Sequence, residues 1–350
     1  MIRIKNVTLP FNFCEMCGIV AYVGHEEAYP ILIEGLKRLE YRGYDSAGVA
    51  LLNGNDEINV YKAKGKVSDL ETFVASKDVS GHIGIAHTRW ATHGEPSQVN
   101  AHPHRSQSGN IALIHNGIIE NYLSLRIELE KRGFRFQSST DTEVLTNLIE
   151  DVQMTGHADL YEAVRIALNQ VVGAYAIVVL EKSHPDQLIA ARKGSPMVIG
   201  IGDGEYFIAS DATPIVGRTQ KVVYVEDEQV VRVKLGEELH IKTIHDMDAT
   251  PYVQELKMNL DSIEKAGFDH FMMKEIYEQP VIVRDTMRGR LHPEANTIRL
   301  GGILQYEKHL LYADNIVFVA CGTSWHASLV GSYLIEKLAK IRVKVEYASE

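Results

Sequence analysis

Cysteine is scarce in this chain, which has only three cysteines in 350 residues, Cys14, Cys17 and Cys321. Their spacing fits neither a disulfide framework nor a structural zinc site, in which cysteines and histidines recur at short, fixed intervals. Sparse cysteine of this kind is typical of a reducing compartment. We therefore expect a cytoplasmic protein without disulfides.

Long apolar runs and a basic excess are also missing. No stretch approaches the roughly 18 consecutive apolar residues that a membrane helix needs, and residues 1–15 lack the apolar core of a secretory signal. Lys and Arg number 36 against 46 Asp and Glu, so the net charge is −10. A nucleic-acid surface needs a basic footprint. Neither a membrane nor a nucleic acid is an expected partner.

Apolar periodicity is present along the first two thirds of the chain. Short apolar runs predict strands near residues 19–23, 47–52, 83–86 and 111–114, and helical spacing predicts helices over 28–39, 122–129, 141–152 and 160–172. Short strands separated by turn residues follow from 175 to 244, with a hairpin at Asp203-Gly204. This order of elements along the chain, with strands followed by helices and then by many strands, indicates an α+β layered domain rather than one parallel sheet.

The remaining sequence changes character. Residues 246–290 are polar and mostly helical in pattern, whereas 315–320, 327–338 and 343–347 predict a strand, a helix and a strand. Two strands and a helix do not bury both faces of a sheet. We therefore expect a domain over 17–245, a helical linker over 246–307 and the beginning of a parallel α/β domain over 308–350.

Cys17 is the candidate nucleophile. It follows Met16, so a chain that starts at Met16 and loses it would place a free α-amino group beside the Cys17 thiol. The reference pKa values of an α-amino group, about 7.7–8.0, and a thiol, about 8.5, are close enough for the amine to act as the base. Residues 1–16 are then expected to be a mis-assigned start or a removed extension. The alternative is a small, buried structural cysteine.

Three other positions could bind the reactants of such a thiol. Arg89, in a loop predicted directly after the strand 83–86, has a planar fork that fits a carboxylate; the alternative is a solvated surface arginine. Asn116 and Gly117 could supply oxyanion donors, or form a simple Asn-Gly turn. Asp141, at the start of a helix, could receive an ammonium group or act as a helix cap.

Other clusters carry weaker signals. The spacings of His87, His93, His102 and His104 match no structural zinc pattern. We therefore expect no metal and no cofactor. The turn from Cys321 to Ser324, between strand and helix, could cradle a phosphate, or be a helix N-cap with a glycine turn.

Taken together, these stretches resemble the glutamine–fructose-6-phosphate aminotransferase family from Cys17 to Glu350. The resemblance rests on their joint occurrence in one order: Cys17-Gly18-Ile19-Val20, Leu39 to Gly48, His87 to Gly94, His115 to Asn121, Lys274 to Pro280, and Ala320 to Ser324.

The resemblance implies a four-layer αββα glutaminase fold of the N-terminal-nucleophile type, followed by the start of a sugar isomerase domain. It also implies roles: Cys17 attacks the glutamine amide, Asn116 and Gly117 form the oxyanion hole, Arg89 holds the α-carboxylate and Asp141 holds the α-amino group.

Further substrate contacts are implied for Arg42, Trp90, Thr92 and His93, with Trp90 closing over the site, and for Thr323 and Ser324 at a sugar-phosphate loop. The implied partners are L-glutamine, fructose 6-phosphate and a second copy of the full-length protein. Since the family's catalytic isomerase residues lie beyond Glu350, we expect this chain alone to hydrolyse glutamine without making glucosamine 6-phosphate.

Two alternatives remain open. One is another amidotransferase with the same first domain, such as an amidophosphoribosyltransferase. The other is a non-catalytic sugar-phosphate-binding protein in which the amine of Cys17 stays blocked by residues 1–16.

Overall fold

A computed structural model describes residues 3–4, 7–8, 17–40, 44–55, 57–89, 97–256, 267–287, 291–292, 297–298 and 312–348. The chain divides into two compact units, one formed by Cys14–Leu260 and the other by Asp261–Glu350 together with Met1–Phe13. Within the described ranges, no helix combines the length and the apolar character that crossing a membrane requires.

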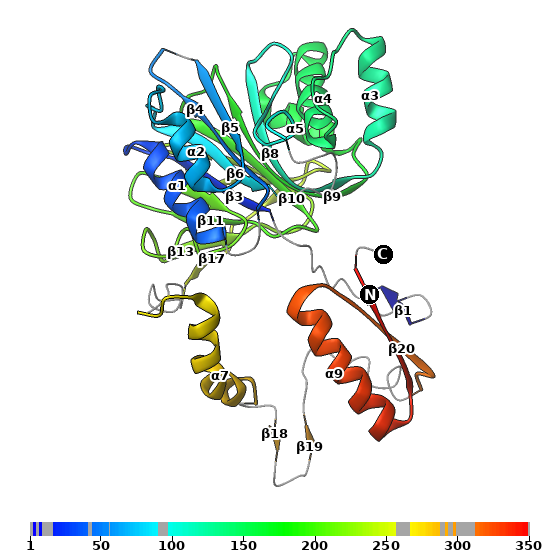
Figure 1. Ribbon diagram of the computed structural model, residues 1–350. Helices are drawn as coiled ribbons and strands as arrows, with labels where there is room; N and C mark the ends of the chain where they lie inside the picture. The colour runs from blue at the N-terminus through cyan, green and yellow to red at the C-terminus, as the bar shows by residue number, and fades with distance from the viewer. Residues whose placement is uncertain are drawn as a thin grey trace. The chain divides into compact units, whose positions relative to one another are not determined.

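The first unit contains two large antiparallel sheets (Figure 1). One consists of β3 (Gly18–Val23), β4 (Ser46–Leu52), β5 (Ile58–Lys64), β6 (Ile83–Arg89), β11 (Val198–Ile201), β12 (Tyr206–Ala209), β13 (Lys221–Tyr224) and β17 (Val253–Glu255). Its strand order is β17-β13-β11-β12-β3-β6-β4-β5, so β3 is an inner strand and β5 an edge.

The other sheet is assembled from strands in the middle and at the end of the unit. Its members are β7 (His104–Arg105), β8 (Ile111–Ile119), β9 (Gly173–Glu181), β10 (Gln187–Lys193), β14 (Gln229–Lys234), β15 (His240–Thr243) and β16 (Asp248–Ala249). The order β16-β15-β14-β10-β9-β8-β7 leaves β7 at an edge.

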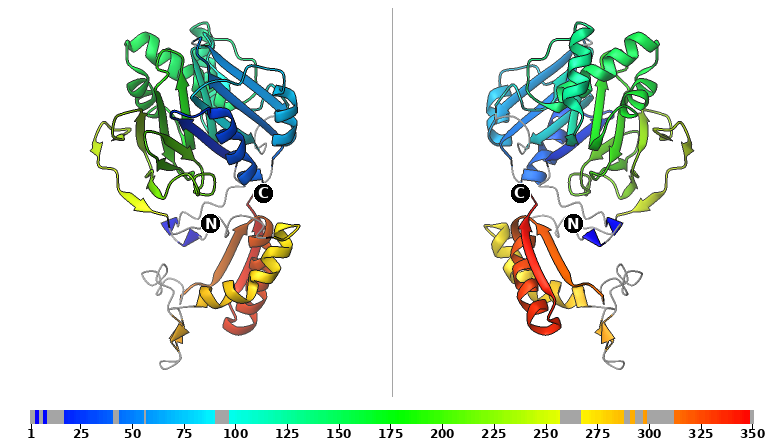
Figure 2. Two further views of the ribbon diagram at one scale, coloured as in Figure 1. Left: turned by 90° about the vertical axis from the view of Figure 1, so that its left-hand side faces the viewer. Right: turned by 90° about the vertical axis from the view of Figure 1, so that its right-hand side faces the viewer.

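Helices cover the outer face of each sheet. Helices α1 (Ala28–Leu39) and α2 (Val67–Val74) pack on the β3 sheet, and α3 (Tyr122–Lys131), α4 (Asp141–Gly156) and α5 (Leu160–Leu168) lie over the β8 sheet. The side views show the same succession of layers (Figure 2). The predicted four-layer αββα fold is confirmed.

Strand β9 shows how alternation produces these layers. Ala176, Val178 and Leu180 face the core between the two sheets. Tyr175, Ile177 and Val179 belong to the separate core beneath α3 to α5. Successive side chains of a strand point to opposite faces, so an unbroken apolar run fills both cores at once.

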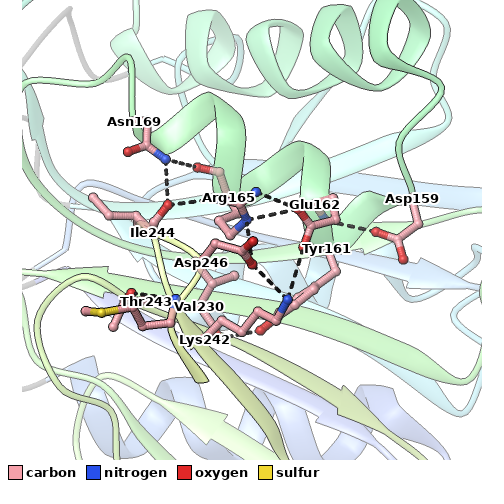
Figure 3. Close-up of polar contacts among 11 residues, drawn as sticks. Asp159, Tyr161, Glu162, Arg165, Asn169, Val230, Lys242, Thr243, Ile244 and Asp246 are labelled. Atoms are coloured by element: carbon pink, nitrogen blue, oxygen red, sulfur yellow. Dashed lines mark hydrogen bonds and ion pairs between the residues drawn. The ribbon is translucent and has the colours of Figure 1, made fainter. Parts of the chain in front are cut away.

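Helix α5 is fixed to the β8 sheet by a polar cluster as well as by apolar packing (Figure 3). The Arg165 guanidinium donates to the Ile244 carbonyl at 3.0 Å and to Glu162 at 2.8 Å, and Asn169 donates to the same carbonyl at 2.7 Å. Lys242 pairs with Asp246 at 2.8 Å. The bonds from Arg165 and Asn169 satisfy the Ile244 carbonyl, which lies just beyond the end of β15.

The second unit contains the expected parallel pair. Strand β20 (Asn315–Ala320) pairs with β21 (Arg342–Tyr347), and α9 (Gly322–Ala339) connects them. Helix α7 (Phe271–Met287) precedes them. Two-residue strands complete the described elements: β1 (Arg3–Ile4) with β2 (Val7–Thr8), and β18 (Leu291–His292) with β19 (Thr297–Ile298).

Some predicted elements differ from the structure. Strand β5 and helix α2 were not expected, since Lys62 and Lys64 interrupt the apolar alternation of this edge strand. Helix α5 ends at Leu168 rather than at 172. Residues 248–249 and 253–255 are strands, not helix, and they pair with β15 and β13, so both sheets continue past residue 245.

Candidate functional site

The site lies where the two sheets meet at one end of β3. Cys17 comes directly before β3, and Gly18 pairs with Thr88 of the neighbouring β6. In the same antiparallel register, Cys17, one residue before Gly18, lies opposite Arg89, the last residue of β6. Asn116 and Gly117 come from β8 of the other sheet. Cys17 is thus brought next to residues that lie 72 to 100 positions away in the sequence.

The start of β3 is held tightly behind the cysteine. The Gly18 amide donates to Thr88 Oγ1 at 3.1 Å, and the Ile19 amide donates to Ser210 Oγ at 3.2 Å. A Cβ at Gly18 would lie 2.6 Å from Thr88 Oγ1 and 2.9 Å from Leu39 Cδ1. Glycine is therefore required here by packing. Cys17 itself is partly exposed and forms no disulfide.

Asn116 links the two sheets at the nucleophile. Its Nδ2 donates to the backbone carbonyl of Cys17 at 2.8 Å, and its Oδ1 lies 2.8 Å from His87 Nε2. An amide oxygen only accepts, so His87 carries its proton on Nε2 and donates. This contact fixes the amide with its N–H groups on the side of Cys17.

His87 is uncharged in this position. It is fully buried, and this burial lowers its pKa to about 3. Its ring stacks on His102 with centroids 4.3 Å apart, and His102 meets His104 edge-on at 5.0 Å. Burial likewise holds the pKa of His102 and His104 well below the usual range. A row of neutral imidazoles therefore supports the Asn116 amide without adding charge.

Gly117 has a backbone that only glycine adopts easily. Its φ is +133°, and a Cβ would lie 2.1 Å from the Ala174 carbonyl oxygen of β9. The turn alternative for Asn116-Gly117 is wrong, because β8 continues through both residues to Ile119. The positive φ re-aims the backbone inside a strand, at the point where it passes Cys17.

Arg89 is buried, and it ends a strand rather than lying in a loop as predicted. Its Nη1 lies 4.0 Å from Asp45 Oδ1, and the Asp45 amide donates to the Arg89 carbonyl at 2.7 Å. Ser46 donates to the same Asp45 oxygen at 2.7 Å. A buried guanidinium beside a fixed carboxylate is pre-oriented, which suits bidentate binding of a second carboxylate.

Asp141 is also buried, and it belongs to the first turn of α4. The cap is Thr140, whose side chain accepts from the Glu143 amide, so the capping alternative for Asp141 is wrong. Asp141 Oδ2 accepts from the Ile119 amide at 2.8 Å. This bond places the carboxylate at the end of β8, two residues beyond Gly117.

The remaining predicted residues fall into two groups. Thr323 and Ser324 lie in the first turn of α9, which begins at Gly322, so the predicted loop is part of the helix. Cys321 occupies the N-cap without a side-chain capping bond. Four other residues lie outside the described ranges: Arg42, Trp90, Thr92 and His93.

A possible metal-binding cluster lies among other residues of the first unit. Within the described ranges, one group of side chains could converge on an ion: His25, Glu26 and Glu205. It shares no residue with the buried histidines. Glu205 accepts from Tyr22 at 2.7 Å and Glu26 pairs with Arg218 at 3.3 Å, so internal contacts already use these carboxylates.

Sequence reasoning missed His87, Thr88 and Ser210 as supports of the nucleophile. The alternation of side chains along β6 could have predicted the position of His87. Ile83 and Ile85 face the core between the sheets. Extending that alternation by two residues places His87 on the same inner face, opposite β8.

Comparisons with known proteins agree with this geometry. A family model described as glutamine amidotransferase domain matches residues 87–216. The chain is 58% identical over 335 residues to the glutamine–fructose-6-phosphate aminotransferase [isomerizing] of Bacteroides thetaiotaomicron, and 54% identical over 342 residues to that of Chlorobaculum tepidum. These alignments cover 96% of this chain and 55% of each relative, so the chain spans about half the length of the curated relatives it matches.

A solved structure described as the allosteric regulatory enzyme of purine biosynthesis is also similar. It superposes with a TM-score of 0.57 at 32% identity, over 65% of this chain and 49% of that chain. The similarity therefore extends to an amidotransferase fold as well as to sequence.

Proposed function

Because the chain belongs to the glutamine amidotransferases, we propose that its first unit hydrolyses L-glutamine to glutamate and ammonia with Cys17 as the nucleophile. The observation that carries the proposal is the hydrogen bond from Asn116 to the Cys17 carbonyl, which holds a side-chain amide donor at the residue proposed as nucleophile. The strained Gly117 backbone follows it in β8.

In the proposed reaction, the free α-amino group of Cys17 removes the thiol proton. The thiolate attacks the side-chain carbonyl carbon of glutamine, and the oxyanion is stabilised by Asn116 Nδ2 and the Gly117 amide. The tetrahedral intermediate collapses to a thioester, and the departing NH₂ takes the proton from the α-ammonium group and leaves as ammonia. Water then hydrolyses the thioester, which releases glutamate and restores the thiol.

Substrate orientation is assigned to two buried charges of opposite sign. Arg89 would bind the α-carboxylate of glutamine through its fork, and Asp141 would accept the α-ammonium group. Arg89 ends β6 and Asp141 opens α4, so the two charges come from different sheets and layers. Arg42, Trp90, Thr92 and His93 complete the proposed substrate contacts.

For the whole protein we propose transfer of this ammonia to fructose 6-phosphate, which gives glucosamine 6-phosphate. Identity to the aminotransferases extends over 96% of the chain, including the second unit with its parallel β20–α9–β21. We assign Thr323 and Ser324 to the sugar phosphate there. The start of a sugar isomerase domain at 308, a homodimer of the full-length protein and a cytoplasmic location belong to the same proposal.

The nucleophile is tested by comparing two cysteine variants. Cys17→Ala should abolish release of glutamate from glutamine, measured by a coupled glutamate assay. Cys321→Ala is the matched control, because Cys321 is the other cysteine in the described part of the chain and lies in the second unit. Turnover in Cys17→Ala equal to that of an active wild type would reject the assignment. An inactive wild type would instead favour the alternative of a non-catalytic sugar-phosphate-binding protein.

A further inference from the structure

The first unit contains a hollow that the proposed reaction does not use. It is a cavity of about 1020 Å³ bounded by the edge strands β5 and β7 and by the beginning of α4. Of the described residues, those proposed to act on glutamine do not line it. Its volume is at the upper end of small-molecule sites, roughly 300–1,000 Å³.

The cavity is positively charged although the chain is acidic. Lys62, Arg105 and Arg135 line it against a single carboxylate, Glu143. Within the described ranges, none of these three cations forms an ion pair with a carboxylate. In a protein of net charge −10, three cations against one carboxylate around one hollow are a local exception.

The one carboxylate in the lining is already occupied by donors. Glu143 accepts from the Gln137 amide at 2.9 Å, from the Ser138 amide at 2.6 Å and from Ser138 Oγ at 2.6 Å. It also lies in the first turn of α4, where the helix dipole favours negative charge. Glu143 also attracts the Lys62 ammonium group, so this carboxylate offsets one of the three cations and the hollow keeps a positive excess.

The deeper part of the lining is polar and fixed. Asn147, which is buried, donates to the Glu143 carbonyl at 3.0 Å and accepts from the Gln107 amide at 2.8 Å. His104 lies 3.1 Å from Thr140 Oγ1. A floor of immobilised polar groups does not suit an apolar occupant, and it needs no rearrangement to bind a polar one.

Lys62 is the least exposed of the three cations. Its Nζ donates to the Val99 carbonyl at 3.0 Å, which leaves further N–H groups for a ligand. Burial lowers the pKa of Lys62 to about 8. A bound anion would restore the favourable environment that the ammonium group loses by desolvation.

From this arrangement we propose that the cavity between β5 and β7 binds a small phosphorylated molecule with at least two negative charges. Lys62, Arg105 and Arg135 contact the phosphate, and the polar floor contacts the rest of the ligand. Arginine forks match phosphate oxygens in pairs, and three cations suit a dianion better than a single carboxylate. Cys17, Arg89, Asn116, Gly117 and Asp141 do not line the cavity, so binding there can be measured in a Cys17→Ala variant and does not depend on the nucleophile.

The test uses the full 350-residue chain and isothermal titration with pyrophosphate, inorganic phosphate and glucose 6-phosphate, each at ionic strength matched with sodium chloride. Saturable binding of at least one probe is expected. Arg135→Ala and Lys62→Gln should each weaken it about tenfold, the loss expected for one charge-assisted hydrogen bond. Arg135 is exposed and Lys62 is partly exposed, so both variants should fold, as thermal melts would verify.

Lys131→Ala is the matched control. It removes the same charge from an exposed position near Arg135 that does not line the cavity, and it should leave the affinity unchanged. The proposal is overturned if no probe binds saturably. It is also overturned if binding survives both Arg135→Ala and Lys62→Gln, as it would if the anion were held by the Thr323–Ser324 turn. Equal weakening by Lys131→Ala would mean general charge attraction and would likewise reject the cavity.

Discussion

Asn116 donates a hydrogen bond from its side-chain amide to the backbone carbonyl of Cys17, across 2.8 Å and 99 residues of sequence. Asn116 belongs to β8 of one sheet and Cys17 directly precedes β3 of the other, so the bond joins the layers at the nucleophile. Its geometry depends on a third residue, because His87 holds the oxygen of the same amide. Most of the expectations for variants follow from this chain of contacts.

Replacing Asn116 removes a donor from the proposed oxyanion hole. Asn116→Ala is expected to lower kcat for glutamine hydrolysis about 10²–10³-fold with little change in KM, because the donor acts mainly on charge that develops in the transition state. Steady-state kinetics measures both constants. Asn59→Ala, at a partly exposed asparagine of β5, is the control. A change confined to KM would assign Asn116 to binding instead.

His87 is expected to act through Asn116 as a positioning residue. His87→Gln keeps an N–H donor and should retain most of kcat, whereas His87→Met loses the donor and should lower kcat about tenfold. KM for glutamine should stay unchanged in both variants. Equal kcat values for Gln and Met at this position would contradict the role, since a merely space-filling residue would not distinguish them.

Arg89→Lys is expected to raise KM for glutamine about tenfold or more, because a point charge does not replace the planar fork at a carboxylate. Arg192→Lys, a substitution of the same kind at an ion pair with Asp227, serves as the control. Titration with glutamate, which keeps the same α-carboxylate, should show a parallel loss of affinity. An unaltered KM would remove Arg89 from the carboxylate site.

The buried histidines make stability depend on pH. Unfolded histidine has a pKa of about 6.5, whereas folded His87 has one of about 3, so between these values only the unfolded state binds the proton. The stabilisation is present above about pH 6.5 and is lost as the pH falls. Each such histidine should cost about 1.4 kcal/mol of unfolding free energy between pH 7.5 and 5.5.

Urea denaturation at the two pH values measures this cost. His102→Gln should reduce the pH-dependent loss by about 1.4 kcal/mol, since the pKa of His102 also lies well below the usual range. His25→Gln, which changes an exposed histidine, is the matched control. An identical pH dependence in wild type and His102→Gln would mean that this imidazole is not held neutral.

Much of the fold was predictable because the signals are local. The apolar spacing of residues 28–39 and the run at 175–180 predict α1 and β9, and Asp203-Gly204 predicts the hairpin between β11 and β12. Edge strand β5 was missed because solvent-facing lysines dilute its alternation. The polar ends of β6 and β8 were missed for a related reason: His87, Arg89 and Asn116 are buried polar residues, and apolar periodicity does not detect them.

The sequence predicts the chemically active residues of the site, but it does not predict the residues that hold them in position. Cys17, Arg89, Asn116 and Asp141 each belong to a recognisable stretch, and the resemblance to known aminotransferases joined them. The contact of His87 with Asn116 depends on the distance between two sheets, which no local pattern specifies. Likewise, the cavity beside Lys62 is bounded by edge strands of two different sheets, β5 and β7, and their placement is a property of the whole topology.

The central claim is that the thiol of Cys17 is activated by its own α-amino group. The most direct test compares glutamine hydrolysis by a chain whose first residue is Cys17 with hydrolysis by the same chain carrying residues 1–16, each verified by N-terminal sequencing. The chain with a free amine should be active, and the extended chain should be slower by at least about 10², the usual contribution of a general base. Equal turnover with residues 1–16 still attached would contradict the mechanism.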